Sequence, residues 1–151
     1  MKKEKIIYWG TTGLFLLMML NSAFQYFTSA DMKAAFVHLG FPDYFRVELA
    51  VAKFIGILAI LIPVVPKNLK QFAYAGFFIT IISAVIGHAS KGDPALNIMI
   101  PAVSGVILLV SYIYFEKLSV SGEKQEFIAS SGDKKLINKI VSYKRFANIK
   151  N

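Results

Sequence analysis

Four long apolar blocks, separated by short polar segments, dominate the pattern of hydrophobic and polar positions along the chain. They cover residues 6–20, 47–65, 72–87 and 98–115. A membrane-spanning helix needs about 20 mostly apolar residues, so four such blocks with short loops between them are typical of a membrane protein. We therefore predict an all-α fold, a four-helix transmembrane bundle with spans at about residues 6–27, 46–65, 71–88 and 95–115.

The polar connector after the first block carries a helical pattern of its own. Four apolar residues in it fall on one helix face, namely Met32, Ala35, Phe36 and Leu39. Ser29 or Asp31 can cap the start of this helix, and Gly40 followed by Pro42 ends it. The pattern predicts a short extracytoplasmic helix that lies at the membrane interface.

The C-terminal segment changes character. The chain divides into a four-span membrane domain, residues 1–118, and a basic tail, residues 119–151. Ser and Gly are frequent in residues 119–132, which predicts a flexible linker. Residues 134–146 carry basic and apolar residues at helical spacing, which favours an amphipathic helix on an anionic membrane surface. The alternative is a solvated tail without a packed face.

Composition agrees with a membrane protein and excludes several chemistries. The chain has 151 residues, of which 56% are hydrophobic, and its mean hydropathy is +0.55. The absence of cysteine excludes disulfides, zinc–thiolate sites and thiol redox chemistry within the chain. The net charge of +8 comes from basic residues that flank the apolar blocks. It therefore indicates membrane topology and a lipid bilayer partner, and no nucleic acid.

The distribution of Lys and Arg predicts the orientation. Three lie before the first block, two in the loop after the second and eight after the fourth. The opposite loops carry only Lys33, Arg46 and Lys91. The positive-inside rule places both termini in the cytoplasm, and we predict a multi-pass protein of the cell inner membrane. Residues 28–30 resemble a signal-peptide cleavage site, but the polar and aromatic residues just before them disfavour cleavage.

Polar residues inside the spans converge at one level in this topology. We predict a ligand-binding pocket in the outer half of the bundle, built from Asn21, Gln25, Glu48, Lys53, His88 and Asn97. Glu48 and Lys53 are five residues apart, about 140° around a helix, so each is expected to find a partner on another element. Charged side chains within a membrane mark functional sites by default.

Each of these residues also has a plain structural interpretation. Glu48 can lie at the lipid headgroups, Lys53 can extend its ammonium group toward water, and His38 on the connector can be a surface residue. Asn21 and Gln25 can hydrogen-bond between helices. Two histidines and one acid at membrane depth do not make a metal site. No catalytic motif is present, so catalytic residues stay unknown and enzyme activity stays open.

Several of these positions together resemble a known family. The segment HLGFPDYF precedes the second span, Glu48, Lys53 and Gly56 stand in E-x-x-x-x-K-x-x-G, Pro63 follows, and His88 closes the third span. Over about residues 5–118 this pattern resembles the DoxX-like family of bacterial membrane proteins. The resemblance implies a four-helix inner-membrane bundle. Some relatives are associated with quinone-linked oxidation of sulfur compounds or are small subunits of membrane redox complexes.

Three functions are compatible with these observations. The first is an accessory subunit of a membrane redox complex that binds a quinone or another small apolar ligand. The second is a structural or assembly protein without chemistry, and the third is a small proton-coupled transporter that acts as a dimer. The expected partners are accordingly the bilayer and either a redox complex or further copies of the chain.

Overall fold

The described part of the chain, residues 2–130 of a computed structural model, is entirely helical. Five α-helices follow one another without strands: α1 (Lys2–Thr28), α2 (Ala30–Leu39), α3 (Asp43–Leu61), α4 (Lys67–Lys91) and α5 (Ala95–Ser130). The chain separates into two compact units, Met1–Tyr114 and Phe115–Asn151, and the boundary falls within α5. The predicted division into membrane domain and tail stays a prediction.

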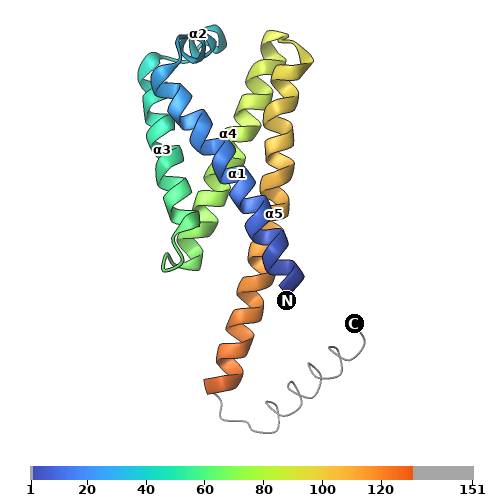
Figure 1. Ribbon diagram of the computed structural model, residues 1–151. Helices are drawn as coiled ribbons and strands as arrows, with labels where there is room; N and C mark the ends of the chain where they lie inside the picture. The colour runs from blue at the N-terminus through green and yellow to red at the C-terminus, as the bar shows by residue number, and fades with distance from the viewer. Residues whose placement is uncertain (1, 131–151) are drawn as a thin grey trace. The chain divides into compact units, whose positions relative to one another are not determined.

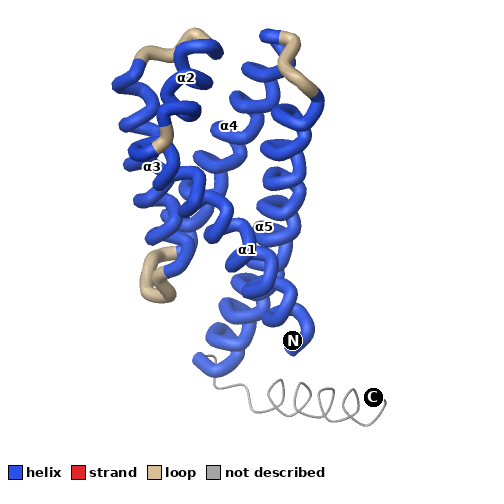
Figure 2. Tube along the Cα trace, turned by 45° about the horizontal axis from the view of Figure 1, so that its top comes forward, coloured by secondary structure: helices blue, strands red, loops and turns tan. Residues whose placement is uncertain are grey.

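The first unit is built from α1, α3, α4 and the first part of α5, with α2 across one end (Figures 1 and 2). Aromatic contacts join these helices. Phe15 of α1 meets Phe77 of α4 edge-on at 5.2 Å, and Tyr74 of α4 lies 5.3 Å from Tyr112 of α5. Phe15, Tyr74 and Phe77 are almost fully buried, so they form the centre of this unit's core.

Three of the helices are long and apolar enough to cross a membrane: α1, α4 and α5 as far as Ile128. The helix α3 is not among them. It has only 19 residues, and its interior carries Arg46, Glu48 and Lys53. The prediction of an all-α membrane protein is thus confirmed, whereas the four-span bundle and its orientation stay predictions.

The helix α3 ends earlier than predicted, at Leu61 instead of residue 65. Pro63 explains this, because it has no N–H group to donate to the carbonyl four residues earlier. The freed end of α3 receives a donor from the next helix. The Nζ of Lys70 lies 3.3 Å from the carbonyl oxygen of Ile60. A cation at a helix C-terminus also interacts favourably with the helix dipole.

The predicted connector helix is confirmed in both of its caps. The side chain of Ser29 accepts a hydrogen bond from the backbone N–H of Met32 at 3.3 Å, so Ser29 and not Asp31 is the cap. Gly40 has a φ of 89°, the left-handed conformation that glycine adopts without penalty. The N–H of Phe41 then donates to the carbonyl of Phe36 at 2.9 Å and closes the helix.

The predicted flexible linker is wrong over residues 119–130, because α5 continues without a break to Ser130. Gly122 is the one glycine in these twelve residues, and no proline interrupts them. One glycine costs a helix about 1 kcal/mol, which the helix-forming residues that follow it can offset. The amphipathic helix predicted at residues 134–146 lies outside the described residues.

Gly56 of α3 lies directly against the ring of Phe77 of α4. A Cβ atom at this position would lie 2.8 Å from the ring of Phe77. That ring cannot easily yield, because it is 4% exposed and already packs against Phe15. The absence of a side chain therefore sets the distance between the two helices.

We predict that Gly56→Ala destabilises the protein by about 1–3 kcal/mol, because an added methyl group overpacks this contact. The measurement is thermal unfolding in detergent. Gly76→Ala on α4 is the matched control, since a Cβ there meets nothing within 4 Å. The melting temperature of the control should equal or slightly exceed that of the parent. Equal stability of both variants would show that the contact with Phe77 does not constrain the helices.

Candidate functional site

Lys53 is the most deeply buried charged side chain in the described part of the chain. It is 5% exposed and shares the buried face of α3 with Ala50 and Ile57. Its ammonium group turns toward α1. Nζ donates to the Oγ of Ser22 at 2.8 Å and lies 4.0 Å from the ring centroid of Tyr26. Ser22 and Tyr26 are four residues apart and thus share one helix face.

No carboxylate among the described residues forms an ion pair with Lys53. Its charge is balanced only by a hydroxyl oxygen and the negative face of an aromatic ring. A desolvated contact of this second kind is worth about 2 kcal/mol. Lys53 is therefore compensated by one hydrogen bond and one ring face, without a carboxylate partner.

Tyr26 also connects Lys53 to the helix across the end of the unit. Its ring meets the ring of Phe36 edge-on at 5.0 Å. Phe36 is the buried residue of α2, and it contacts the rings of Phe41 and Phe45 as well. The aromatic cluster beneath α2 thus reaches the Lys53 ammonium group through a single ring.

A second polar cluster gathers around Asp93, between α4 and α5. Gly92 ends α4 with a φ of 68°, which turns the chain so that the N–H of Asp93 bonds to the carbonyl of His88. The carboxylate then lies beside two imidazoles. Oδ2 pairs with the Nδ1 of His88 at 2.5 Å, and Oδ1 pairs with the Nε2 of His38 at 2.8 Å.

The two histidines hold the pKa of Asp93 below its ordinary value. The hydrogen bond from His88 is the largest cause, followed by that from His38. An ionised carboxylate only accepts, so Nδ1 of His88 and Nε2 of His38 must both carry protons. The side chain of Asp93 is 12% exposed and that of His38 is 55% exposed. The bridge therefore joins α2 to the α4–α5 loop at the edge of the solvent.

The structure places the six residues that were predicted to line one pocket in different surroundings. Lys53 is buried and His88 is partly buried, each in a different cluster. Asn21, Glu48 and Asn97 are exposed, and Gln25 is partly buried. No hydrogen bond or ion pair within residues 2–130 joins any two of the six. Their role in ligand binding stays a prediction, but a shared polar pocket does not support it.

The sequence pattern led to residues of α1 that are adjacent to the ones that contact Lys53. On α1 it chose Asn21 and Gln25, whereas Ser22 and Tyr26, the same spacing displaced by one residue, meet Lys53. The signal was present, since Ser22 and Tyr26 continue the inward face of α1 that includes Met19. Asp93 was overlooked because a loop aspartate between glycine and proline is usually a turn residue.

A third polar group lies at the opposite end of the first unit, where the pattern indicated almost only apolar residues. The Oγ atom of Ser111 stands 2.6 Å from the Oγ1 of Thr12 and 2.8 Å from the hydroxyl of Tyr74. All three residues are at most 1% exposed. Their hydrogen bonds join α1, α4 and α5. In the part that the structure describes, no buried side-chain polar atom is without a partner.

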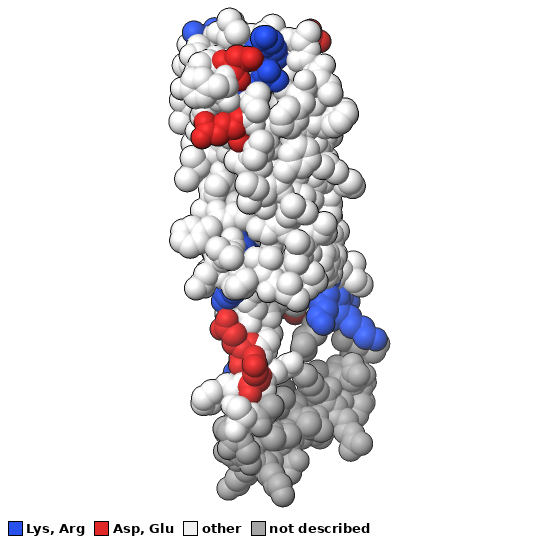
Figure 3. Space-filling view, turned by 90° about the vertical axis from the view of Figure 1, so that its left-hand side faces the viewer, with Lys and Arg blue, Asp and Glu red and all other residues white. Residues whose placement is uncertain are grey.

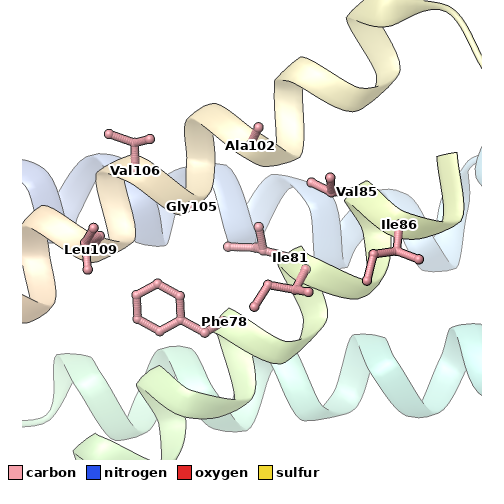
Figure 4. Close-up of a pocket in the computed structure, with 9 residues that line it drawn as sticks. Phe78, Ile81, Val85, Ile86, Ala102, Gly105, Val106 and Leu109 are labelled. Atoms are coloured by element: carbon pink, nitrogen blue, oxygen red, sulfur yellow. The ribbon is translucent and has the colours of Figure 1, made fainter. Parts of the chain in front are cut away.

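An apolar groove of about 300 Å³ runs between α4 and α5 (Figure 4). Nine residues line it, none with a polar side chain: Phe78, Ile81, Ile82, Val85, Ile86, Ala102, Gly105, Val106 and Leu109. The helices approach most closely at Gly105, where a Cβ atom would lie 3.2 Å from Ile81. The groove can hold an apolar chain, but its side chains offer no hydrogen bond to a polar head.

The polar clusters of the described residues offer few side chains that could hold a metal ion. Within residues 2–130 no group of three or more His, Asp or Glu side chains is arranged to hold a metal ion. The Asp93 cluster uses both of its carboxylate oxygens on histidines. The arrangement can orient imidazoles and hold protons at the edge of the unit.

The apolar helices and the internally satisfied polar groups define an all-helical membrane protein. The chain belongs to the DoxX-like family, whose model matches residues 10–111. The match covers the second and third predicted spans completely and the first and fourth except residues 6–9 and 112–115. It includes Lys53, Asp93 and the groove. Comparison with curated proteins and with solved structures gave no match.

We predict that Lys53 and Tyr26 are coupled by about 1–2 kcal/mol in a double-mutant cycle, because the ring stabilises the buried cation. Tyr26→Leu should destabilise the parent but have a smaller effect in the Lys53→Met background, where no charge faces the ring. The measurement is thermal or denaturant unfolding in detergent. Additive effects of the two substitutions would show that the ring contributes packing alone.

We also predict an acid-sensitive contribution of Asp93 to stability. Because its pKa is lowered in the folded state, this contribution is complete above the ordinary value of about 4 and is lost as the pH falls through the lower folded value. Melting temperatures between pH 6 and pH 3 should fall more steeply for the parent than for Asp93→Asn. Parallel curves would contradict the prediction.

Proposed function

We propose that this DoxX-like protein is an accessory membrane subunit that holds the apolar chain of a quinone or a similar lipid in the α4–α5 groove. The single observation that carries the proposal is the wholly apolar lining of this groove. Its volume of about 300 Å³ is at the lower end of the range for small-molecule pockets. An isoprenoid or acyl chain needs such a slot and no hydrogen bond.

The proposal changes which residues bind the ligand. The sequence pattern favoured a polar pocket around Glu48, Lys53 and His88, with a donor for the quinone ring. Lys53 and His88 are instead occupied by contacts within the protein. The apolar groove therefore supports recognition of the tail of the ligand and not of its head.

The proposal includes a four-span arrangement in the bacterial inner membrane with both termini in the cytoplasm. The helix α3 qualifies as the fourth span on physical grounds, since 19 residues extend about 28 Å and match the hydrocarbon core. Its buried Lys53 faces α1, and the exposed face below Glu48 is apolar. In Figure 3 charged side chains lie at the end that carries α2 and again farther along the chain, and the surface between them is almost entirely uncharged.

One observation favours a structural or assembly role instead. Every buried side-chain polar atom within the described residues has a hydrogen-bond partner in the protein. Polar groups that are all satisfied internally stabilise a bundle and need no ligand. Under this alternative the groove is a packing gap that a partner helix or ordinary lipid fills.

Ala102→Phe tests the two functions. Ala102 lines the groove and is exposed, so the larger ring should fill the groove without overpacking the core. We predict that photolabelling by a quinone with a photoreactive long chain falls at least about tenfold, equivalent to about 1.4 kcal/mol of binding. The matched control is Ala75→Phe, an exposed alanine of α4 outside the groove.

The control variant should label like the parent. If Ala102→Phe labels as well as the parent and melts at a higher temperature, the groove is a packing gap and the structural role is favoured. Unchanged labelling at an unchanged melting temperature would also contradict binding in the groove.

A further inference from the structure

We propose that α2 is a strap whose attachment to the α4–α5 loop controls the access of water to Lys53. The helix is joined covalently to α1 through Ser29 and to α3 through residues 40–42. It lies across one end of the unit, above the aromatic cluster (Figure 1). No direct chain connection joins α2 to α4 or α5, so this side is the one that can part.

The attachment has one polar contact and one apolar contact. The polar contact is the hydrogen bond between Nε2 of His38 and Oδ1 of Asp93, the one such link from α2 to the α4–α5 loop within residues 2–130. The apolar contact places Leu39 over Gly87 of α4, where a Cβ atom would lie 3.5 Å from the leucine methyl group. Leu39 therefore packs over Gly87 at close to van der Waals distance.

The remaining polar contact of α2 does not hold this side. Lys33 pairs with Asp43 at 3.8 Å, and both side chains are at least half exposed. Such a pair is worth little. Asp43 is also the first residue of α3 and belongs to the covalently joined side of the strap. Parting from the α4–α5 loop therefore leaves the pair intact.

The strap is coupled to Lys53 through two aromatic contacts. Phe36 of α2 meets Tyr26 of α1, and the Tyr26 ring lies over the Lys53 ammonium group. When Phe36 moves away, Tyr26 loses its packing partner and water gains a path toward Nζ. Lys53 favours this opening because water solvates an ammonium group better than one hydroxyl and one ring do.

The physical basis of the device is a small difference between two states. The closed state gains the Asp93–His38 hydrogen bond and the burial of Phe36 and Leu39. The open state gains hydration of Lys53. A cation that is paired with a carboxylate inside the protein would gain less free energy from hydration. The absence of an ion pair at Lys53 therefore makes the open state accessible.

The absence of native cysteine makes the test direct, because any introduced thiol is the only one in the chain. Ala50→Cys is the reporter, since Ala50 is 0% exposed and lies one turn from Lys53 on the same face of α3. The rate at which a water-soluble maleimide labels this thiol in detergent measures opening. In the parent background labelling should be slow.

Adding His38→Ala should speed labelling by about tenfold, because one charge-assisted hydrogen bond of the closed state is lost. His38→Gln keeps an N–H donor on its side chain and should label more slowly than His38→Ala. Val37→Ala is the matched control on α2, since Val37 is 64% exposed and lies beside the contact without joining it. The control should label like the parent.

A second readout separates opening from general unfolding. In a chain that carries Leu39→Cys and Gly87→Cys, a short bis-maleimide should cross-link α2 to α4. The cross-link should form efficiently in this background and less efficiently when His38→Ala is added. Lys53→Met should restore slow labelling of the Ala50→Cys reporter in the His38→Ala background, because the open state then gains no free energy from hydration of a cation.

The proposal is overturned if His38→Ala changes neither the labelling rate nor the cross-linking, or if Lys53→Met leaves the fast labelling of His38→Ala unchanged. Failure of these experiments leaves the proposed groove function untouched, because the groove on α4 and α5 shares no residue with the strap contacts.

Discussion

The structure of the first unit depends on one constraint: a polar group that the helices bury must find its partner inside the protein. In a hydrocarbon environment water cannot replace a missing hydrogen bond. Polar pairing follows at three levels: among the buried hydroxyl groups around Ser111, at the buried Lys53, and at Asp93 on the edge of the solvent. Each level ties together helices that are distant in sequence, so polar pairing and helix packing specify the same arrangement.

Lys53 satisfies the constraint least completely. Ser22 and Tyr26 supply one acceptor and one ring face. Two carboxylates at this end of the unit pair with other residues, Asp43 with Arg46 and Asp93 with two histidines. This distribution of charge concentrates strong pairing at the end of the unit and leaves a weakly compensated cation beneath it. The proposed strap uses this difference, while the apolar groove between α4 and α5 has its own separate lining.

The sequence predicted the helices well because hydropathy and cap residues are local signals. Ser29, Gly40 and Pro42 delimit α2, and Pro63 ends α3 near the expected position. The continuation of α5 through Gly122 was not predictable from composition, because a Ser- and Gly-containing segment adopts either state depending on its neighbours. Local patterns therefore sufficed for the elements, with errors at their ends.

The site was less predictable, because it depends on which face of each helix turns inward. A shift of one residue moves a side chain by about 100°, enough for Asn21 to be predicted on the face of α1 that Ser22 occupies beside Lys53. The pairing of His38 with Asp93 joins residues 55 positions apart, and no periodicity in a single sequence reveals it. The groove depends on the small size of Ala102 and Gly105 and likewise leaves no motif.

That long separation has a consequence for how the protein is made. During synthesis the chain emerges from its N-terminus, so α1, α2 and α3 are present before the residue that accepts the bond from His38. The Asp93 carboxylate arrives only with the turn that follows α4. Until then α2 has no polar anchor on that side. If α2 acts as the proposed strap, we expect this end of the bundle to close during biogenesis only once the turn between α4 and α5 is complete.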